Sequence, residues 1–154
     1  MSRDIRIENL TIRTAEGTIL VDDVSVRFGT HKPLCLIGET GSGKSLVMHA
    51  VFGSLPDSLQ CDGAILLDGQ NLLVLSARER RDLWGRTISL LPQEPSRALD
   101  PTMSVLAQVA EIYPALHGES WQTAKSQALS DLTSVGLDTA MNAYPFELSG
   151  GMAQ

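Results

Sequence analysis

The chain has 154 residues and a formal net charge of -6 at pH 7, and 43% of its residues are hydrophobic. Such a composition excludes a disordered or fibrous chain, and the acidic balance argues against a general nucleic-acid-binding protein. The two cysteines, Cys35 and Cys61, exclude a disulfide scaffold and a zinc site of the usual spacing. No apolar run reaches the roughly 20 residues of a membrane-spanning helix. We therefore expect a soluble, cytoplasmic globular protein.

The N-terminal third of the chain is predicted to form strands around one glycine-rich loop. Alternating apolar residues predict two strands within residues 4–28. The continuous apolar run 34–37 predicts a further strand that is buried on both faces, with Cys35 in the core. A helix is expected over residues 45–52, after the loop.

The middle of the chain carries short-range signals for a turn and a helix. Residues 65–67 followed by the Asp-Gly pair at 68–69 predict a strand and a tight turn. Ser76 and Glu79 have the spacing of a capping box, which predicts the start of a short helix. Residues 87–91 predict another apolar strand.

A basic cluster surrounds Trp84, toward the end of that short helix. Its members are Arg78, Arg80, Arg81 and Arg86. Two interpretations stay open: a solvated helix face with Trp84 turned inward, or a contact to a partner or a phosphate.

From residue 104 onward the pattern becomes helical. One face of a predicted helix carries Trp121, Ala124, Ala128, Leu132 and Val135. Gly136 follows as its expected C-cap, and we expect Trp121 to pack in the core with Ala128 and Leu132. The order of strands first and helices second predicts an α/β fold with a helical part.

Residues 38–45 match the phosphate-loop pattern G-x-x-x-x-G-K-[ST] in full, between a predicted strand and a predicted helix. Glycines let successive N–H groups turn toward phosphate oxygens, and the helix N-terminus favours an anion. Lys44 is expected to neutralise the β- and γ-phosphates of ATP, and the Ser45 hydroxyl to bind Mg²⁺. The predicted phosphate-binding residues are Gly38, Glu39, Thr40, Gly41, Ser42, Gly43, Lys44 and Ser45.

Two further motifs follow in a fixed order. Residues 148–154 read LSGGMAQ, which resembles the signature motif of ABC-type ATPases, the energy-converting subunits of ABC transporters. Residues 91–95 read LPQEP, which resembles the Q-loop of that family. The chain therefore resembles the N-terminal part of an ABC transporter ATP-binding subunit. The strings at 96–101 and 144–149 look like the peptide and nickel importer branch.

The resemblance implies a fold, partners and residue roles. The fold is an α/β P-loop NTPase core, with a mixed N-terminal sheet and strands around the phosphate loop, over residues 1–95. A helical subdomain over 96–154 ends in the signature. Two such ATPase domains pack head to tail, dock on transmembrane permease subunits and trap ATP between them. The signature residues expected to face the partner's ATP are Ser149, Gly150, Gly151 and Gln154. Gln93 is expected to sense the γ-phosphate, Mg²⁺ and the attacking water.

The chain departs from the family in two places. Where many members stack an aromatic side chain on adenine, we align Arg13, which either stacks as a cation on the base or is a solvated strand residue. The family's Walker B strand, its Asp and its catalytic Glu are expected after Gln154, so no catalytic base is assigned within these residues. We therefore predict negligible turnover by this polypeptide alone.

The sequence favours one function and leaves two alternatives open. The favoured function is coupling of ATP binding and hydrolysis to import of a small substrate such as a peptide or nickel. That function implies a cytoplasmic subunit on the inner face of the cell membrane, with no nucleic-acid partner. The alternatives are a truncated, non-catalytic nucleotide-binding fragment and an ABC-type ATPase of DNA repair or translation.

Overall fold

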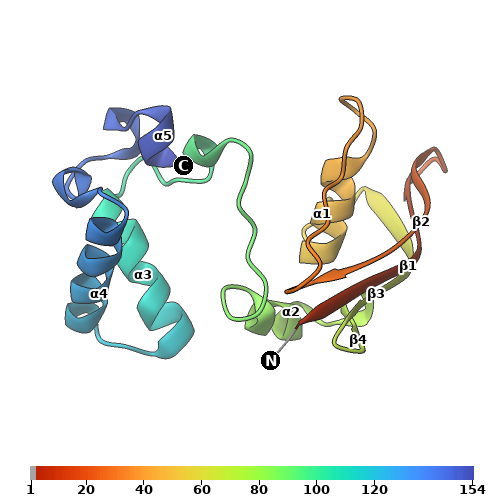
Figure 1. The fold of residues 1–154 in the computed structure, drawn as a ribbon, viewed down its shortest axis with the longest axis horizontal. Coiled ribbons are helices and arrows are strands. Elements are labelled where there is room, and N and C mark those ends of the chain that lie inside the picture. The colour runs from red at the N-terminus through yellow and green to blue at the C-terminus, as the bar shows by residue number, and fades with distance from the viewer. Residues whose placement is uncertain (1–2) are drawn as a thin grey trace. The chain divides into compact units, whose positions relative to one another are not determined.

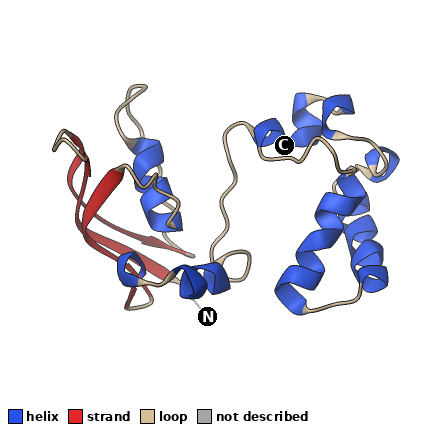
Figure 2. Cartoon of the chain, turned by 180° about the vertical axis from the view of Figure 1, so that it is seen from behind, coloured by secondary structure: helices blue, strands red, loops and turns tan. Residues whose placement is uncertain are grey.

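The computed structural model describes residues 3–154. The chain divides into two compact units, Met1–Ser89 and Leu90–Gln154, and each is described by itself. All strands of the described residues belong to the first unit, whereas the second is helical (Figure 2). No helix within residues 3–154 is long and apolar enough to cross a membrane.

The first unit contains a four-stranded sheet in the order β2-β1-β3-β4 (Figure 1). Each neighbouring pair runs antiparallel, and β1 is the strand that pairs with both long neighbours. The strands are β1 (Asp4–Thr14), β2 (Ile19–Gly29), β3 (Leu59–Leu67) and β4 (Gln70–Asn71).

Helix α1 (Lys44–Phe52) packs on one face of this sheet. Val47 and Ala50 are its buried residues, and they belong to the same core cluster as the sheet's apolar side chains. The largest fully buried side chains of the described residues all come from β1 and β3: Ile7, Leu10, Ile12 and Ile65. Large branched side chains of the sheet therefore form the core on which α1, the helix after the glycine-rich loop, packs.

The short-range signals are confirmed. Asp68 and Gly69 have φ values of 49° and 90° and form the tight turn between β3 and β4. Ser76 caps α2 (Ala77–Leu83): its Oγ accepts from the N–H of Glu79 at 3.3 Å. The Glu79 carboxylate accepts in return from the Ser76 N–H at 2.8 Å, which completes the capping box. A 3-10 turn (Leu72–Val74) connects β4 to this helix.

The second unit is built on a pair of helices, α3 (Val105–His117) and α4 (Trp121–Ser134). Small side chains bring them together, because the buried cluster between them consists of Ala110, Ala124 and Ala128. The Tyr113 hydroxyl on α3 donates a hydrogen bond to Asp131 on α4. Short 3-10 turns (Pro95–Arg97, Asp138–Ala140 and Pro145–Glu147) and helix α5 (Gly150–Ala153) complete the unit.

The α/β class with a helical part is confirmed, but two predicted strands are wrong. Residues 34–37 have no regular structure, Cys35 is exposed, and Ile37 is 91% exposed. A strand needs the N–H and C=O groups of a neighbour, and the four strands of the described residues pair with one another instead. The sheet is therefore antiparallel throughout residues 3–154, and not mixed as predicted.

The second wrong strand is the segment 87–91. The N–H groups of Thr87 and Ile88 donate to the Leu83 carbonyl, at 2.8 and 3.1 Å. These bonds close a turn at the end of α2, and only a single bridge joins Trp84 to Ile88 in this part of the described chain.

The helical face predicted for α4 is confirmed in its centre and wrong at its ends. Ala124, Ala128 and Leu132 are buried, whereas Trp121 is 52% and Val135 67% exposed. Trp121 is the first residue of α4 and Val135 is its C-cap. At a helix end the side chain has a neighbouring turn on one side only, so the same periodic position is less covered there.

Candidate phosphate-binding site

The phosphate loop, residues 38–43, owes its shape to glycine. Gly41 and Gly43 have φ values of 86° and 85°, which lie in the left-handed region. A Cβ on Gly43 would lie 2.8 Å from Cγ2 of Val21 and 3.0 Å from the carbonyl oxygen of Leu20. The loop therefore rests directly on β2, and a larger residue at position 43 would push it away from the sheet.

The N-terminus of α1 is open to an anion. Gly43 is its N-cap and supplies no side-chain hydrogen bond, and the first turn carries no acidic residue. The first N–H groups of the helix thus keep their donor capacity, and the helix dipole adds positive potential there. A pocket of about 190 Å³ lies at this end, lined by Gly41, Ser42, Gly43, Lys44, Ser45 and Leu46.

Lys44 is held over the loop by oxygen acceptors. Its Nζ donates to the carbonyl oxygens of Gly38 and Glu39 at 2.9 and 2.6 Å, and to Oγ of Ser42 at 3.2 Å. A Cβ on Gly38 would lie 2.8 Å from this same Ser42 Oγ, so glycine at position 38 makes room for the arrangement. The ammonium group thereby lies beside the uncapped helix N-terminus. Phosphate oxygens bound there would compete with the loop oxygens as acceptors of its hydrogen bonds.

The remaining loop residues fit a nucleotide with a divalent cation. Ser45 is exposed on the first turn of α1, and Glu39 and Thr40 are exposed at the rim of the loop. No group of three His, Cys, Asp or Glu side chains within residues 3–154 could hold a metal by itself. A cation at this site would therefore be held by the Ser45 hydroxyl together with oxygens of the nucleotide, which is how Mg²⁺ is usually bound beside phosphates.

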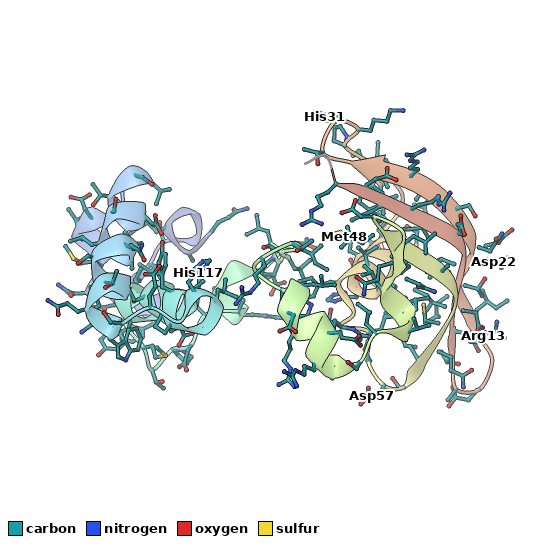
Figure 3. The ribbon with its side chains drawn as sticks, turned by 90° about the horizontal axis from the view of Figure 1, so that it is seen from below. Arg13, Asp22, His31, Met48, Asp57 and His117 are labelled. Atoms are coloured by element: carbon teal, nitrogen blue, oxygen red, sulfur yellow. The ribbon has the colours of Figure 1, made fainter. Side chains whose placement is uncertain are left out.

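Arg13 lies on β1 near the turn to β2, and Figure 3 shows it at the opposite end of this hairpin from His31. Its Nη2 donates to Oδ2 of Asp62 on β3 at 2.6 Å, and its side chain is 39% exposed. The pair restrains the guanidinium group and offsets its charge. Adenine stacking on Arg13 stays a prediction.

Gln93 and the signature residues belong to the second unit. Gln93 is exposed in a segment without regular structure. Ser149 is the N-cap of α5, and its Oγ accepts from the N–H of Met152 at 3.3 Å. A Cβ on Gly150 or Gly151 would meet no described atom within 4 Å, so packing in this chain does not require glycine there. Gln154, at the end of α5, is exposed.

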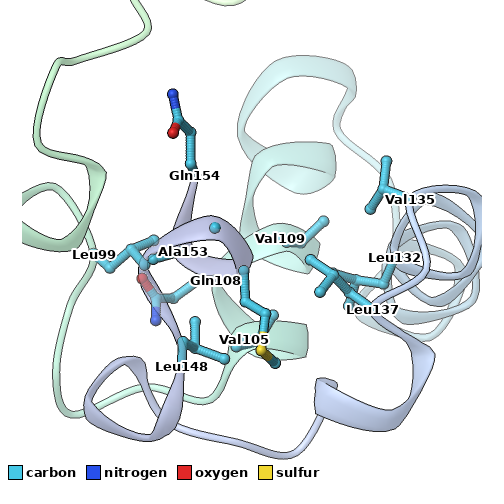
Figure 4. A pocket seen from close by; sticks show the side chains of 12 residues that line it. Leu99, Val105, Gln108, Val109, Leu132, Val135, Leu137, Leu148, Ala153 and Gln154 are labelled. Carbon is cyan, nitrogen blue, oxygen red and sulfur yellow. The ribbon is translucent and has the colours of Figure 1, made fainter.

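A second pocket, of about 310 Å³, lies beside α5 within the second unit (Figure 4). Its lining is almost entirely apolar and carries no charged side chain among the described residues. The lining residues are Leu99, Val105, Gln108, Val109, Leu132, Val135, Leu137, Leu148, Gly151, Met152, Ala153 and Gln154. Such a pocket does not suit a phosphate, because a buried anion requires donors or counter-charges.

Several contacts that shape the phosphate site are not visible in the motif. Leu20 and Val21 support Gly43, but they are ordinary apolar strand residues in the sequence. The C-terminal end of α1 is likewise contacted by Trp84, which stacks on Phe52 with ring centroids 5.1 Å apart. In the sequence, only the basic cluster around Trp84 indicated that the segment at the end of α2 has a role of its own.

Comparisons with known proteins agree with the motifs. Residues 21–154 match the model of a family described as ABC transporter. The chain is 38% identical to the peptide transport system ATP-binding protein SapD of Salmonella typhimurium, over 96% of this chain and 48% of the relative. It is 33% identical to the dipeptide transport ATP-binding protein DppD of Caldanaerobacter subterraneus, over 100% and 49%. It is 32% identical to the metal-staphylopine import system ATP-binding protein CntD of Staphylococcus aureus, over 97% and 57%. The chain thus spans about half the length of these curated relatives.

Proposed function

Because the chain belongs to the ABC transporter family, we propose that it acts as the ATP-binding subunit of an importer. It would couple ATP binding and hydrolysis to the entry of a small substrate, and the names of the relatives favour a peptide over nickel. The observation that carries the proposal is the phosphate loop, with Lys44 held beside an uncapped helix N-terminus.

Each residue of the loop has a chemical task in this proposal. The N–H groups at the start of α1 bind phosphate oxygens, and Lys44 leaves its loop acceptors to neutralise their charge. The Ser45 hydroxyl contributes a ligand to Mg²⁺, which when bound draws charge away from the phosphates. Gly38, Gly41 and Gly43 keep the backbone close enough for these contacts.

The second unit supplies the other half of the proposed mechanism. Ser149, Gly150 and Gly151 would contact the ATP of a second ATPase domain packed head to tail, with Gln154 beside them. Gln93 would respond to the γ-phosphate, Mg²⁺ and water. Transmembrane permease subunits would bind this subunit on the inner face of the membrane and supply the substrate path.

Two other functions make different predictions. An ATPase of DNA repair or translation would need a basic surface for phosphates, whereas the chain carries a net charge of -6; salt-dependent binding to DNA or ribosomes would favour it. A non-catalytic module would bind nucleotide without turnover.

Replacing Lys44 by alanine tests the proposed site. We expect Lys44→Ala to abolish the thermal stabilisation that Mg-ATP gives the wild type, with little change in stability without ligand. Ligand at ten times its dissociation constant stabilises the folded state by about 1.4 kcal/mol, which differential scanning fluorimetry detects. The matched control is Lys32→Ala, because Lys32 is an exposed lysine of the same unit. Equal shifts in wild type and Lys44→Ala would contradict the assignment of the phosphate loop.

A second measurement separates binding from turnover. We expect the purified 154-residue chain to release phosphate from ATP at a negligible rate, because no carboxylate base is assigned within it. Colorimetric phosphate release that depends on Lys44 would contradict this expectation.

A further inference from the structure

The C-terminal end of α1 is held by two side chains from α2 and the residue after it. Trp84 donates from Nε1 to the carbonyl oxygen of Phe52 at 3.0 Å and stacks on the Phe52 ring at an interplanar angle of 9°. Arg80 donates from Nη1 to the carbonyl oxygen of Gly53 at 2.9 Å. These two carbonyls belong to the group that a helix leaves without intrahelical partners at its C-terminus.

Arg80 also packs on the helix end. A Cβ on Gly53 would lie 2.4 Å from Cδ and 2.7 Å from Nε of Arg80, so the guanidinium stem crosses directly over Gly53. The glycine has a φ of 76° and ends the helix in the left-handed region. A cation placed over the last turn also interacts favourably with the negative end of the helix dipole.

The opposite end of the same helix is the phosphate site. α1 has only nine residues, a length of about 13 Å. Its buried residues are two, Val47 and Ala50, among those described, and its N-cap Gly43 makes no side-chain bond. Leu46 and Val51 also pack, partly buried, against the core, so the sheet holds the body of the helix while Arg80 and Trp84 hold its C-terminal end. A tilt there would move the N–H groups at the other end of the helix, which are proposed to bind the phosphates.

We propose that Arg80 and Trp84 are positioning residues of the phosphate site, acting through the C-terminus of α1. The inference rests on the function proposed above, and it assigns Arg80, one member of the basic cluster around Trp84, a role at the carbonyls that end α1. Displacing a binding group by about 1 Å is enough to weaken a site severely. Arg80 and Trp84 touch neither phosphate nor Mg²⁺ in this proposal.

Isothermal titration calorimetry with Mg-ATP tests the proposal in the purified protein. We expect Arg80→Gln to weaken nucleotide affinity roughly fivefold, the equivalent of one lost helix-end interaction. The matched control is Arg78→Gln, because Arg78 is an exposed arginine of the same helix, and we expect its affinity to stay within about twofold of wild type. Equal affinities for Arg80→Gln and Arg78→Gln would overturn the proposal.

A conservative variant keeps the test decisive if Arg80→Gln does not fold. Trp84→Phe retains a six-membered aromatic ring to stack on Phe52 and removes the pyrrole ring of the indole, with its Nε1–H donor to the Phe52 carbonyl. We expect it to weaken Mg-ATP binding a fewfold, measured at a temperature where the protein is fully folded, with a small fall in melting temperature from the lost hydrogen bond. A lower melting temperature with unchanged affinity would mean a purely structural role and would overturn the proposal.

Trp84 also provides a spectroscopic signature, because the sequence contains only one other tryptophan, Trp121. In a Trp121→Phe background, Mg-ATP should change the Trp84 emission with the midpoint found by calorimetry, and Lys44→Ala should abolish the change. Binding heat without any change in Trp84 emission would overturn the coupling. No binding heat in the wild type would overturn the proposed function itself, and this inference with it.

Discussion

The core of the first unit is built from large branched side chains, whereas the core between α3 and α4 is built from alanines. Ile7, Leu10, Ile12 and Ile65 are at most 1% exposed in the first. Ala110, Ala124 and Ala128 are fully buried in the second. A sheet and a helix are kept apart by bulky side chains, whereas two helices that approach closely need small ones. The two units should therefore lose stability through opposite changes. Shortening a core side chain should destabilise the first unit, and lengthening one should destabilise the second.

Shortening a side chain in the first core should have the largest effect. Ile12→Ala removes a fully buried side chain between β1 and α1 and leaves a cavity, so we expect a loss of about 3 kcal/mol in the free energy of unfolding. Urea unfolding followed by Trp84 fluorescence in a Trp121→Phe background measures it.

The first unit offers its own control for this change. Ile37→Ala makes the same substitution at a position that is 91% exposed, where we expect a change within about 0.5 kcal/mol. A cost at Ile37 equal to that at Ile12 would show that the exposed segment 34–37 packs against something in solution.

Lengthening a side chain in the second core should have an intermediate effect. Ala128→Leu inserts three carbon atoms where α4 touches α3, and we expect a loss of about 2 kcal/mol from overpacking. Ser130→Leu places the same side chain at an exposed position of α4 and should be nearly neutral. Trp121 fluorescence in a Trp84→Phe background follows this unit in urea. A neutral Ala128→Leu would contradict the close approach of the two helices.

The features that the sequence predicted correctly are those decided by neighbours along the chain. The Ser76–Glu79 capping box and the Asp68-Gly69 turn each depend on a few consecutive residues. The glycine-rich loop before α1 is local in the same sense, because its motif contains most of the groups that form it, and its binding of phosphate stays a prediction.

The features that the sequence missed depend on residues far along the chain. The run 34–37 has the composition of a buried strand, but a strand exists only where another supplies its hydrogen bonds. Arg13 meets Asp62 across the β1–β3 pairing, whose register shifts between Glu8 and Thr11. No local pattern reports such a shift, because the pairing is set by two segments separated by some fifty residues.

The smallest predicted effect concerns charge at the edge of the first unit, where Asp68 ties the β3–β4 turn to the start of β1. Arg3 donates to its carboxylate at 2.7 Å and the Asp4 N–H donates at 3.0 Å, and these bonds lower the pKa of Asp68 from its ordinary value of 3.8. A lowered pKa in the folded state means that the stabilisation is complete above the ordinary pKa and is lost as pH falls through the folded value.

Asp68→Asn tests this, because asparagine tolerates the φ of 49° at this position. We expect the difference in unfolding free energy between wild type and Asp68→Asn to stay constant from neutral pH down to about pH 5 and to shrink at lower pH. Because Asp68 and Arg3 are both exposed, 1 M salt should reduce the difference, since the Debye length falls there to about 3 Å. The same difference at pH 2 as at pH 7 would assign the effect to the shape of the turn. A cycle with Arg3→Gln, in which the two effects fail to add, would instead assign it to the ion pair.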